Sequence, residues 1–194
     1  MARRSRRALW TAKVLGELSS KPKTDDEVFA KHVGRKAYHG VILGIDPSLR
    51  GTGLALVEFL PSGSRLLASC TVKVKPKEPL PVCLGKIFHA VQEMLAKAEV
   101  RQVAIEETIY VQNHKAVHIL GAARGAAITA VAIAGLEVFE YAPRRIKQAV
   151  VGLGGASKEQ VAGMVAQHLG CASLPLDEAD AAATALCHAF TWRG

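Results

Sequence analysis

Residues 41–46 read Val-Ile-Leu-Gly-Ile-Asp, and Pro47 follows them directly. Five apolar or small residues in a row are typical of a strand buried on both faces, and the pair Asp-Pro ends such a strand. A carboxylate at the end of a buried strand is costly unless a cation or hydrogen-bond donors compensate its charge. Asp46 is therefore the first candidate functional residue, and this strand begins the folded domain.

The residues that follow predict two more strands joined by short turns. Residues 54–59 and 65–74 are rich in apolar and β-branched side chains, and the turn residues 61–64 separate them. The glycines in Leu49-Arg50-Gly51-Thr52-Gly53 predict a tight connection before the second strand. Three successive strands with short connections imply an antiparallel meander.

From residue 84 onward the apolar spacing changes to that of helices alternating with strands. One helical face carries Leu84, Ile87, Phe88, Val91 and Leu95. The remaining segments predict strands at 103–106 and 138–141, and helices at 113–134, 143–150, 158–169 and 177–190. The capping box Ser157-Lys158-Glu159-Gln160 opens the helix at 158–169. The order βββαβαβααα predicts an α/β domain with a five-stranded mixed sheet, three antiparallel strands then two parallel ones, flanked by helices.

Positive charge is concentrated at the N-terminal end. The 194 residues carry 25 Lys and Arg against 17 Asp and Glu, a formal net charge of +8. Residues 1–40 hold 10 of the basic and 4 of the acidic residues, which leaves 15 and 13, a net of +2, for the rest. We expect residues 1–39 to be a disordered basic arm that meets a polyanion, and residues 40–194 to be one folded domain. The Arg-rich start also fits an organellar transit peptide, so both interpretations stay open.

The apolar runs and the cysteines indicate a protein of a reducing compartment. The longest apolar stretch, residues 121–135, is too short to span a bilayer and contains Arg124. The cysteines, Cys70, Cys83, Cys171 and Cys187, form no CxxC pair and no metal-type spacing. We expect reduced cysteines, a soluble cytoplasmic protein associated with the nucleoid, and no membrane partner.

Three further carboxylates stand where a core-building sequence would not place them. Glu106 ends the fourth strand, and Asp177 and Asp180 share one face at the start of the last helix. Adjacent strand ends and one helix face can bring these acids to Asp46, and clustered carboxylates are the ligands that Mg²⁺ and Mn²⁺ prefer. Each acid alone has an ordinary explanation: a turn at Asp46, a helix cap at Asp177, or a solvated pair of Glu106 with Glu107. The joint arrangement favours a metal site.

Residues 41 to about 188 resemble the RuvC family of crossover junction endodeoxyribonucleases, the Holliday-junction resolvases. The resemblance covers about three quarters of the chain and rests on six blocks that match in order and at compatible spacings: Leu43-Gly44-Ile45-Asp46-Pro47, Ala104-Ile105-Glu106, Gly121-Ala122-Ala123-Arg124-Gly125, Val138-Phe139-Glu140-Tyr141-Ala142, Lys147-Gln148-Ala149-Val150-Val151-Gly152 and Asp177-Glu178-Ala179-Asp180-Ala181. It implies an RNase H-like fold with Asp46, Glu106, Asp177 and Asp180 as the catalytic, metal-binding quartet. Glu107 matches no catalytic position of the family.

The same resemblance implies the reaction and the partners. Hydrolysis would use two Mg²⁺ ions, which Mn²⁺ can replace, about 4 Å apart at the scissile phosphate, and would leave a 5′-phosphate and a 3′-hydroxyl. A homodimer would nick two opposing strands of a four-way DNA junction symmetrically, during homologous recombination and DNA repair. A RuvA/RuvB branch-migration complex is the further partner expected.

Three basic residues are candidates for DNA contact. Lys147 and Lys158 flank the Gly-rich loop of residues 152–156, whose backbone N–H groups could face a phosphate. A plain connector is the alternative for this loop, but both lysines match the family, which favours contact with the DNA backbone. Arg124 also matches a family residue, and its alternative is a buried arginine paired with a carboxylate.

One position departs from the family's pattern. The third residue after the catalytic glutamate is an aromatic that stacks at the junction centre in many relatives, whereas this chain has Ile109 there and Tyr110 next to it. Either Tyr110 stacks from the neighbouring position or Ile109 acts as an aliphatic wedge. His114 and His118 lack the glutamate and the third ligand of an HExxH zinc site, so we expect no zinc there, and they could instead face DNA.

Three other functions fit parts of the sequence. Residues 44–48 with 51–53 look like the first phosphate loop of actin-like sugar kinases, but about 155 folded residues cannot supply the second domain that those enzymes need. A non-catalytic junction-binding protein would lack a metal ligand, and all four acids are present. Another RNase H-like nuclease or a transposase would share the acids, and only the six matching blocks separate it from a resolvase.

Overall fold

The computed structural model describes residues 37–107 and 114–193. The chain divides into two units, Met1–Lys36 and Ala37–Gly194, and the description below concerns the second. The expected basic arm therefore lies almost wholly outside the described residues, and so do Ile109 and Tyr110.

Five strands form one mixed sheet in the order β3-β2-β1-β4-β5. The strands are β1 (Gly40–Asp46), β2 (Gly51–Leu60), β3 (Gly63–Lys73), β4 (Val100–Glu106) and β5 (Val138–Tyr141). The first three pair antiparallel, whereas β4 runs parallel to β1 and β5 runs parallel to β4. The predicted α/β class, with three antiparallel strands followed by two parallel ones, is confirmed.

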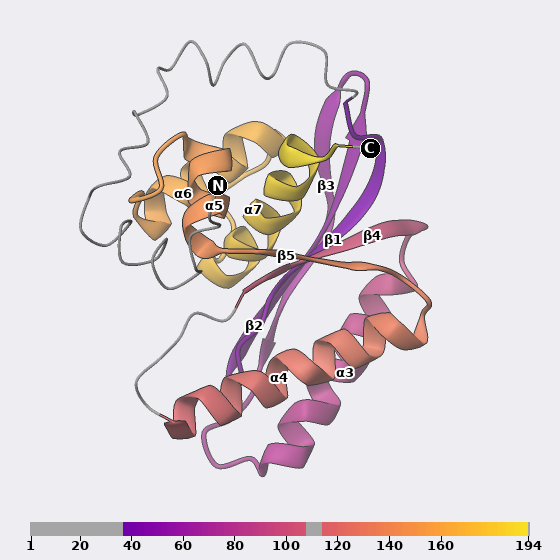
Figure 1. Ribbon diagram of the computed structural model, residues 1–194, viewed down its shortest axis with the longest axis vertical. Coiled ribbons are helices and arrows are strands. Elements are labelled where there is room, and N and C mark those ends of the chain that lie inside the picture. Colours follow the sequence, from indigo (N-terminus) through magenta and orange to yellow (C-terminus); the bar gives the residue numbers. More distant parts are fainter. Residues whose placement is uncertain (1–36, 108–113, 194) are drawn as a thin grey trace, which may run out of the picture. The chain divides into compact units, whose positions relative to one another are not determined.

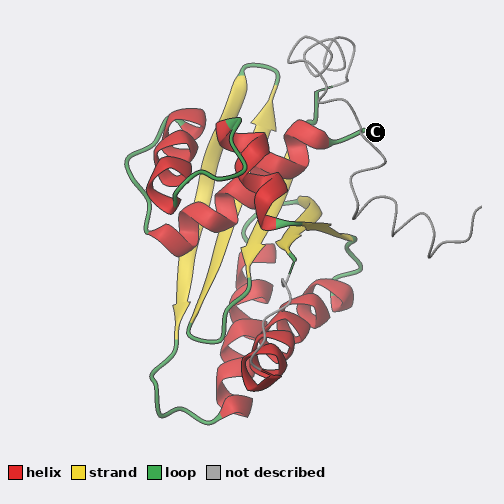
Figure 2. Ribbon diagram, turned by 60° about the vertical axis from the view of Figure 1, so that its left-hand side comes forward, coloured by secondary structure: helices red, strands yellow, loops and turns green. Residues whose placement is uncertain are grey.

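Helices cover both faces of the sheet (Figure 1, Figure 2). One face carries α3 (Leu80–Leu95) and α4 (His114–Ile133), and the other carries α5 (Pro143–Val151), α6 (Lys158–Leu169) and α7 (Leu176–Thr191). Alternate residues of each strand point to opposite faces, so the buried apolar side chains divide into two cores, one against each helical layer.

The parallel pairing of β1 with β4 brings two of the candidate acids together. The register places Gly44 beside Ala104 and Ile45 beside Ile105, so that Asp46 and Glu106 end adjacent strands at the same edge of the sheet. Gly44 and Ala104 lie in register two residues before these acids, and Ala104 belongs to the core under α7. By the alternation of strand side chains, Asp46 and Glu106 therefore point to the face that α7 covers.

The tight connection predicted over residues 49–53 is shorter in the structure: it ends at Arg50, whereas Gly51, Thr52 and Gly53 form the start of β2 and pair with neighbouring strands. The glycines are needed because α7 lies almost on the backbone of the sheet. A Cβ atom at Gly53 would overlap the Asp177 carbonyl oxygen, and one at Gly44 would overlap the Ala181 carbonyl oxygen. The sequence pattern marks a close approach between two elements of structure rather than a turn.

The helix starts that position the lysines are as predicted. Pro143 begins α5, and Gly152 ends it with a positive φ of 81°. The capping box that opens α6 is present: Ser157 Oγ accepts from the Gln160 amide, and Gln160 Oε1 accepts from the Ser157 amide at 2.9 Å. Lys158 is consequently fixed at the first position of α6.

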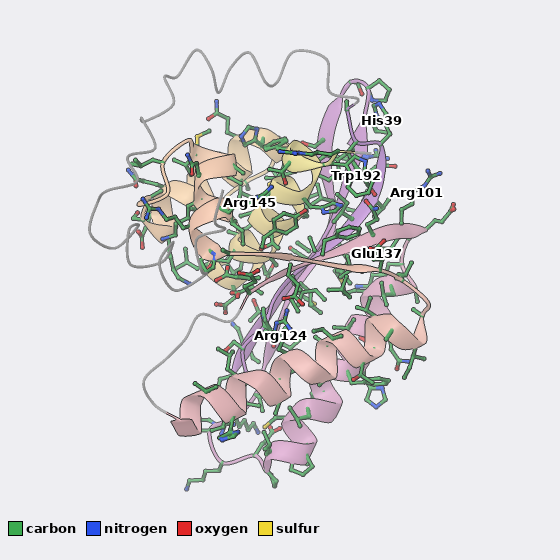
Figure 3. All side chains as sticks on the ribbon, in the orientation of Figure 1. His39, Arg101, Arg124, Glu137, Arg145 and Trp192 are labelled. Carbon is green, nitrogen blue, oxygen red and sulfur yellow. The ribbon has the colours of Figure 1, made fainter. Side chains whose placement is uncertain are left out.

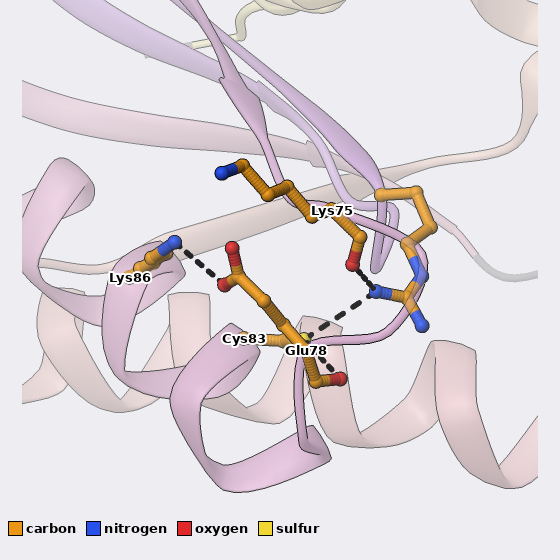
Figure 4. Close-up of polar contacts among 5 residues, drawn as sticks. Lys75, Glu78, Cys83 and Lys86 are labelled. Carbon is orange, nitrogen blue, oxygen red and sulfur yellow. Dashed lines mark hydrogen bonds and ion pairs between the residues drawn. The ribbon is translucent and has the colours of Figure 1, made fainter.

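Polar contacts hold the chain just before β2 and just after β3. After β1, Thr52 Oγ1 both accepts from the Ser48 amide and donates to the Ser48 carbonyl, which closes the turn that follows Asp46. The Arg50 guanidinium donates to the carbonyls of Lys75 and Pro76 in the segment that leads to α3. An ion pair of 2.6 Å between Lys86 Nζ and Glu78 Oε2 fastens the same segment to α3 (Figure 4).

A buried histidine ties α7 to the two parallel strands. His188 is fully buried, and its ring nitrogens bond to Tyr141 Oη at 2.7 Å and to Gln102 Oε1 at 2.8 Å. Aromatic rings surround it, and the Phe139 ring is closest at 4.6 Å between centroids. Burial lowers the pKa of His188 to about 4. The imidazole is therefore neutral and serves to fix the packing of α7.

We expect this histidine to make the fold sensitive to acid. Its pKa is depressed from 6.5 to about 4, so the stability it contributes is complete above pH 6.5 and is lost as pH falls toward 4. The loss amounts to about 3 kcal/mol at most. Urea unfolding at a series of pH values measures it, with His188→Gln as the comparison. The difference in unfolding free energy between the two proteins should shrink as pH falls through this range. A difference independent of pH would contradict the assignment.

The structure bears on two expectations from the sequence, which concern membrane-spanning helices and the state of the cysteines. Among the described residues, no helix is both long enough and apolar enough to cross a membrane. All four cysteines have free thiols, and Cys83 and Cys187 are buried.

Candidate active site

The candidate residues converge at the ends of β1 and β4. Asp46, Glu106 and Asp180 line one pocket of about 180 Å³ together with Lys147 and Lys158. The walls of the pocket are completed by Pro143 and Ile146 of α5 and by Val161 of α6. Five of the nine residues proposed from the sequence therefore share one pocket, although they come from five different elements of structure.

Asp177 stands next to this pocket without lining it. Its Oδ2 atom would lie 2.9 Å from a Cβ atom at Gly51, so the carboxylate rests against the start of β2. It is also close enough to Asp46 for the two negative charges to repel each other. The structure thus brings all four candidate acids into one neighbourhood.

Burial and mutual repulsion of the acids in the pocket outweigh the attraction of the nearby lysines. Burial raises the pKa of Asp46 to about 6, and repulsion from Asp180 and Asp177 adds to the rise, while Lys158 opposes it. Burial likewise raises the pKa of Glu106 to about 7, again with repulsion from Asp46 and Asp180. Carboxylates held together against their own repulsion in a half-buried pocket are typical of a site that binds a cation.

Each of the two lysines contacts a different part of the pocket. Lys158 Nζ lies 2.6 Å from Asp180 Oδ2, and this hydrogen bond raises the pKa of the lysine. Lys147 Nζ donates to the Ala156 carbonyl at 2.8 Å and so holds the Gly-rich loop at the rim of the pocket. Lys158 is 56% exposed, which leaves its ammonium accessible to a ligand.

The donor set fits a hard divalent cation. Its oxygen atoms come from carboxylates, which Mg²⁺ and Mn²⁺ prefer. Positive charge placed among them would offset the repulsion and the burial that raise the pKa values of Asp46 and Glu106. As the side chains stand, no three acidic, histidine or cysteine groups within residues 37–107 and 114–193 converge closely enough to hold a metal ion. Rotation of the carboxylates toward a common point, with Asp180 turning from Lys158, would be needed to complete the ligand set.

Arg124 has a partner inside the protein. Its Nη2 atom lies 2.6 Å from Glu140 Oε2 of β5, and only 17% of the arginine side chain is exposed. The contact is an ion pair by distance but lacks the geometry of a hydrogen bond. Arg124 lies between α4 and the sheet (Figure 3). This placement supports the alternative in which the arginine pairs with a carboxylate and helps to fix α4.

The remaining candidates do not enter the pocket described above. Ile109 and Tyr110 lie outside the described residues. His118 is exposed and lines a separate pocket of about 550 Å³ with Leu49, Arg50 and Leu80.

One polar group beside this site carries no signal in the sequence. Glu178 stands between the two acids of α7 and accepts hydrogen bonds from Ser69 and Thr71 of β3. No pattern in the sequence marks these contacts, because β3 and α7 are more than 100 residues apart.

A mixed sheet with carboxylates at the ends of β1 and β4 and on the helix above them defines the class of RNase H-like nucleases. The profile of one family, described as "Crossover junction endodeoxyribonuclease RuvC", matches residues 42–188. The chain belongs to the RuvC family.

Individual relatives agree with this assignment. The RuvC protein of Chromohalobacter salexigens is 41% identical over 155 residues, which cover 79% of this chain and 83% of the relative. The RuvC protein of Burkholderia thailandensis is 44% identical over 151 residues, which cover 76% and 82%. Family membership favours a junction nuclease over the kinase, ribonuclease and transposase alternatives.

Solved structures are similar to the fold described here. RuvC of Thermus thermophilus in complex with a Holliday junction substrate matches with a TM-score of 0.73 and 39% identity, over 78% of this chain and 94% of that one. The yeast mitochondrial Holliday junction resolvase Ydc2 matches with a TM-score of 0.56 but only 11% identity, over 92% and 88%, so it supports the fold alone.

Proposed function

We propose that this protein is a structure-selective endonuclease that resolves Holliday junctions by hydrolysing one phosphodiester bond in each of two opposing strands. The observation that carries the proposal is the pocket in which Asp46, Glu106 and Asp180 meet two lysines at the ends of parallel strands. Cleavage of a synthetic four-way junction, compared with a linear duplex of the same sequence, tests it.

Asp46, Glu106, Asp177 and Asp180 would hold the divalent cations. Mg²⁺, or Mn²⁺ in its place, would supply Lewis-acid activation of water and stabilisation of the departing 3′ oxygen. The protein's own part is to keep these carboxylates close together and partly desolvated, a state that already raises the pKa of Asp46 and of Glu106. The unfavourable repulsion in the free protein thereby favours binding of the cations.

The two lysines are proposed to position the DNA. Lys158 is mostly exposed and pairs with Asp180, so a phosphate oxygen can replace or share that partner. Lys147 holds the loop of residues 152–156 through the Ala156 carbonyl, and a phosphate at the pocket would face both ammonium groups. They would orient the scissile phosphate against the acids, which would otherwise repel it.

Paired nicking requires two such sites, so we propose that the protein acts as a homodimer. The expected RuvA/RuvB complex would bring the junction to it. Residues 1–39, with most of the net positive charge, are proposed to add contacts to the phosphate backbone.

Substitution of either lysine in the pocket should weaken junction binding, and should slow cleavage by more. We expect Lys147→Ala and Lys158→Ala each to weaken binding by roughly 1–2 kcal/mol and to reduce the slope of log K against log salt by about one. Cleavage should fall further, because a phosphate displaced by about 1 Å is no longer aligned for attack. Binding titrations at two salt concentrations and single-turnover cleavage measure both effects.

Lys75→Ala provides the matched control. It removes the same formal charge from an exposed loop, and it retains the backbone carbonyl that accepts from Arg50 (Figure 4). We expect little change in binding or cleavage. Equal effects from all three substitutions would mean that the DNA responds to net charge alone, and the proposed role of the pocket lysines would be wrong.

A further inference from the structure

The start of α7 carries a third carboxylate that makes its contacts away from the metal pocket. Glu178 stands between Asp177 and Asp180, and its Oε2 atom accepts from Ser69 Oγ at 2.5 Å. Its Oε1 atom accepts from Thr71 Oγ1 at 3.2 Å. One carboxylate is therefore bound by two hydroxyl groups of β3.

The sheet is shaped to allow this contact. Ser69 and Thr71 are two residues apart on β3, so they share a face, and their register partners on β2 are Ala55 and Gly53. These partners are small, and the Asp177 carbonyl lies directly above Gly53. The first turn of α7 can therefore lie across β2 and reach β3 with a side chain.

Beyond these bonds, the described contacts of this turn are its close approach to Gly53 and the ion pair of Asp180 with Lys158 of α6. The close approach sets the distance between helix and sheet, and the ion pair holds Asp180 to α6 and not to the sheet. Pro175, which precedes the helix, makes no side-chain cap. Side-chain tips lie about 5–6 Å from a helix axis, so a rotation of about 10° moves a carboxylate by about 1 Å. Metal–ligand distances tolerate only about 0.2 Å. Repulsion from Asp46 also acts on Asp177 and Asp180, and would push the turn off the sheet.

We propose that Glu178 is a positioning residue, whose two hydrogen bonds to Ser69 and Thr71 hold the first turn of α7 so that Asp177 and Asp180 face Asp46 and Glu106. The inference rests on the proposed function, since it takes these four acids to be the metal ligands. Glu178 itself would touch neither metal nor DNA.

The test is Mn²⁺ binding to the full chain, measured by calorimetry without DNA. Removing a group that orients metal ligands commonly weakens metal binding by 10–100-fold. We expect about tenfold weaker binding in Glu178→Ala and in the double variant Ser69→Ala/Thr71→Val. Combining all three substitutions should weaken it no further, because both sets remove the same contact. Glu178→Gln retains one acceptor oxygen and can donate to the other hydroxyl, so its affinity should stay within about threefold of wild type.

Glu58→Ala is the matched control. It removes a carboxylate that also bonds across β2 and β3, to Arg65 at 2.6 Å, but at the opposite end of these strands. It should leave Mn²⁺ binding unchanged. Cleavage kinetics provide a second measurement: Glu178→Ala should lower kcat about tenfold at subsaturating Mn²⁺ and leave the metal-free affinity for the junction unchanged. Excess Mn²⁺ should restore most of the rate.

The outcomes separate this inference from the proposed function. If Asp46→Asn abolishes Mn²⁺ binding but Glu178→Ala binds Mn²⁺ like wild type, the positioning role is overturned and the metal site stands. If Glu178→Gln is as impaired as Glu178→Ala, the hydrogen bonds are not the cause and the inference is also overturned. A wild-type protein that binds no Mn²⁺, or an Asp46→Asn variant that binds it normally, overturns both.

Discussion

Asp46→Asn should abolish junction cleavage and leave the fold and the affinity for the junction nearly intact. We expect kcat to fall at least about a thousandfold, equivalent to roughly 4 kcal/mol in the activation barrier. Asparagine has the same shape as aspartate but lacks the charge that a hard cation requires, so one of the metal ligands is lost. Single-turnover cleavage and junction-binding titrations measure the two quantities separately.

The same substitution should raise stability in the absence of metal. The pKa of Asp46 is raised to about 6 in the folded protein, above its value of 3.8 in an unfolded chain, so its charge at pH 7 destabilises the fold. Removing that charge should recover about 3 kcal/mol at most. The control is Glu107→Gln, which changes the exposed acid that follows Glu106 in the sequence. It should alter neither cleavage nor stability. Cleavage by Asp46→Asn at near the wild-type rate would show that the quartet is assigned wrongly.

Gly53→Ala should damage both stability and cleavage, although it adds only one methyl group. Its Cβ atom would overlap the Asp177 carbonyl oxygen, which is backbone and can yield only if α7 moves off the sheet. Overpacking of this kind costs typically 1–3 kcal/mol, and we expect about 3 kcal/mol because two regular elements must separate. Cleavage should fall at least a hundredfold even where the variant is folded, because Asp177 and Asp180 move with the helix. Urea unfolding and single-turnover cleavage measure the two losses.

Gly163→Ala is the control for this steric argument. Gly163 lies exposed in the middle of α6, and no atom lies within 4 Å of a Cβ placed there. The substitution should stabilise the protein by about 0.5–1 kcal/mol through helix propensity and leave cleavage unchanged. If Gly53→Ala is as stable and as active as wild type, the close seating of α7 on β2 is wrong.

The sequence predicted the elements well where periodicity or capping carries the signal. The capping box at Ser157 places the start of α6, and the change of period at residue 84 separates α3 from the strands before it, although the helix itself begins at Leu80. The acids of the site could be predicted as well, because a carboxylate directly after a buried strand contradicts ordinary core patterning. Asp46 and Glu106 do lie side by side as adjacent parallel strands require.

Other features depend on contacts that no local pattern records. Gly51 and Gly53 suggested a turn, since glycine has the same local signature in a turn and beneath a close-packed helix. The ion pair of Arg124 with Glu140 joins α4 to β5, and the bonds of Glu178 join α7 to β3. Partners of this kind are set by tertiary packing, so only their residue types can be seen in the sequence.

Whether this protein is a metal-dependent junction resolvase can be measured by cleavage of a synthetic four-way junction, with the nicks mapped on all four strands. With Mg²⁺ we expect paired nicks at symmetric positions on two opposing strands, with ends that a ligase can seal. The same amount of protein should leave a linear duplex of identical sequence uncut, and EDTA should abolish cleavage. Cutting that persists in EDTA, or that is equally fast on the linear duplex, would contradict a metal-dependent junction resolvase.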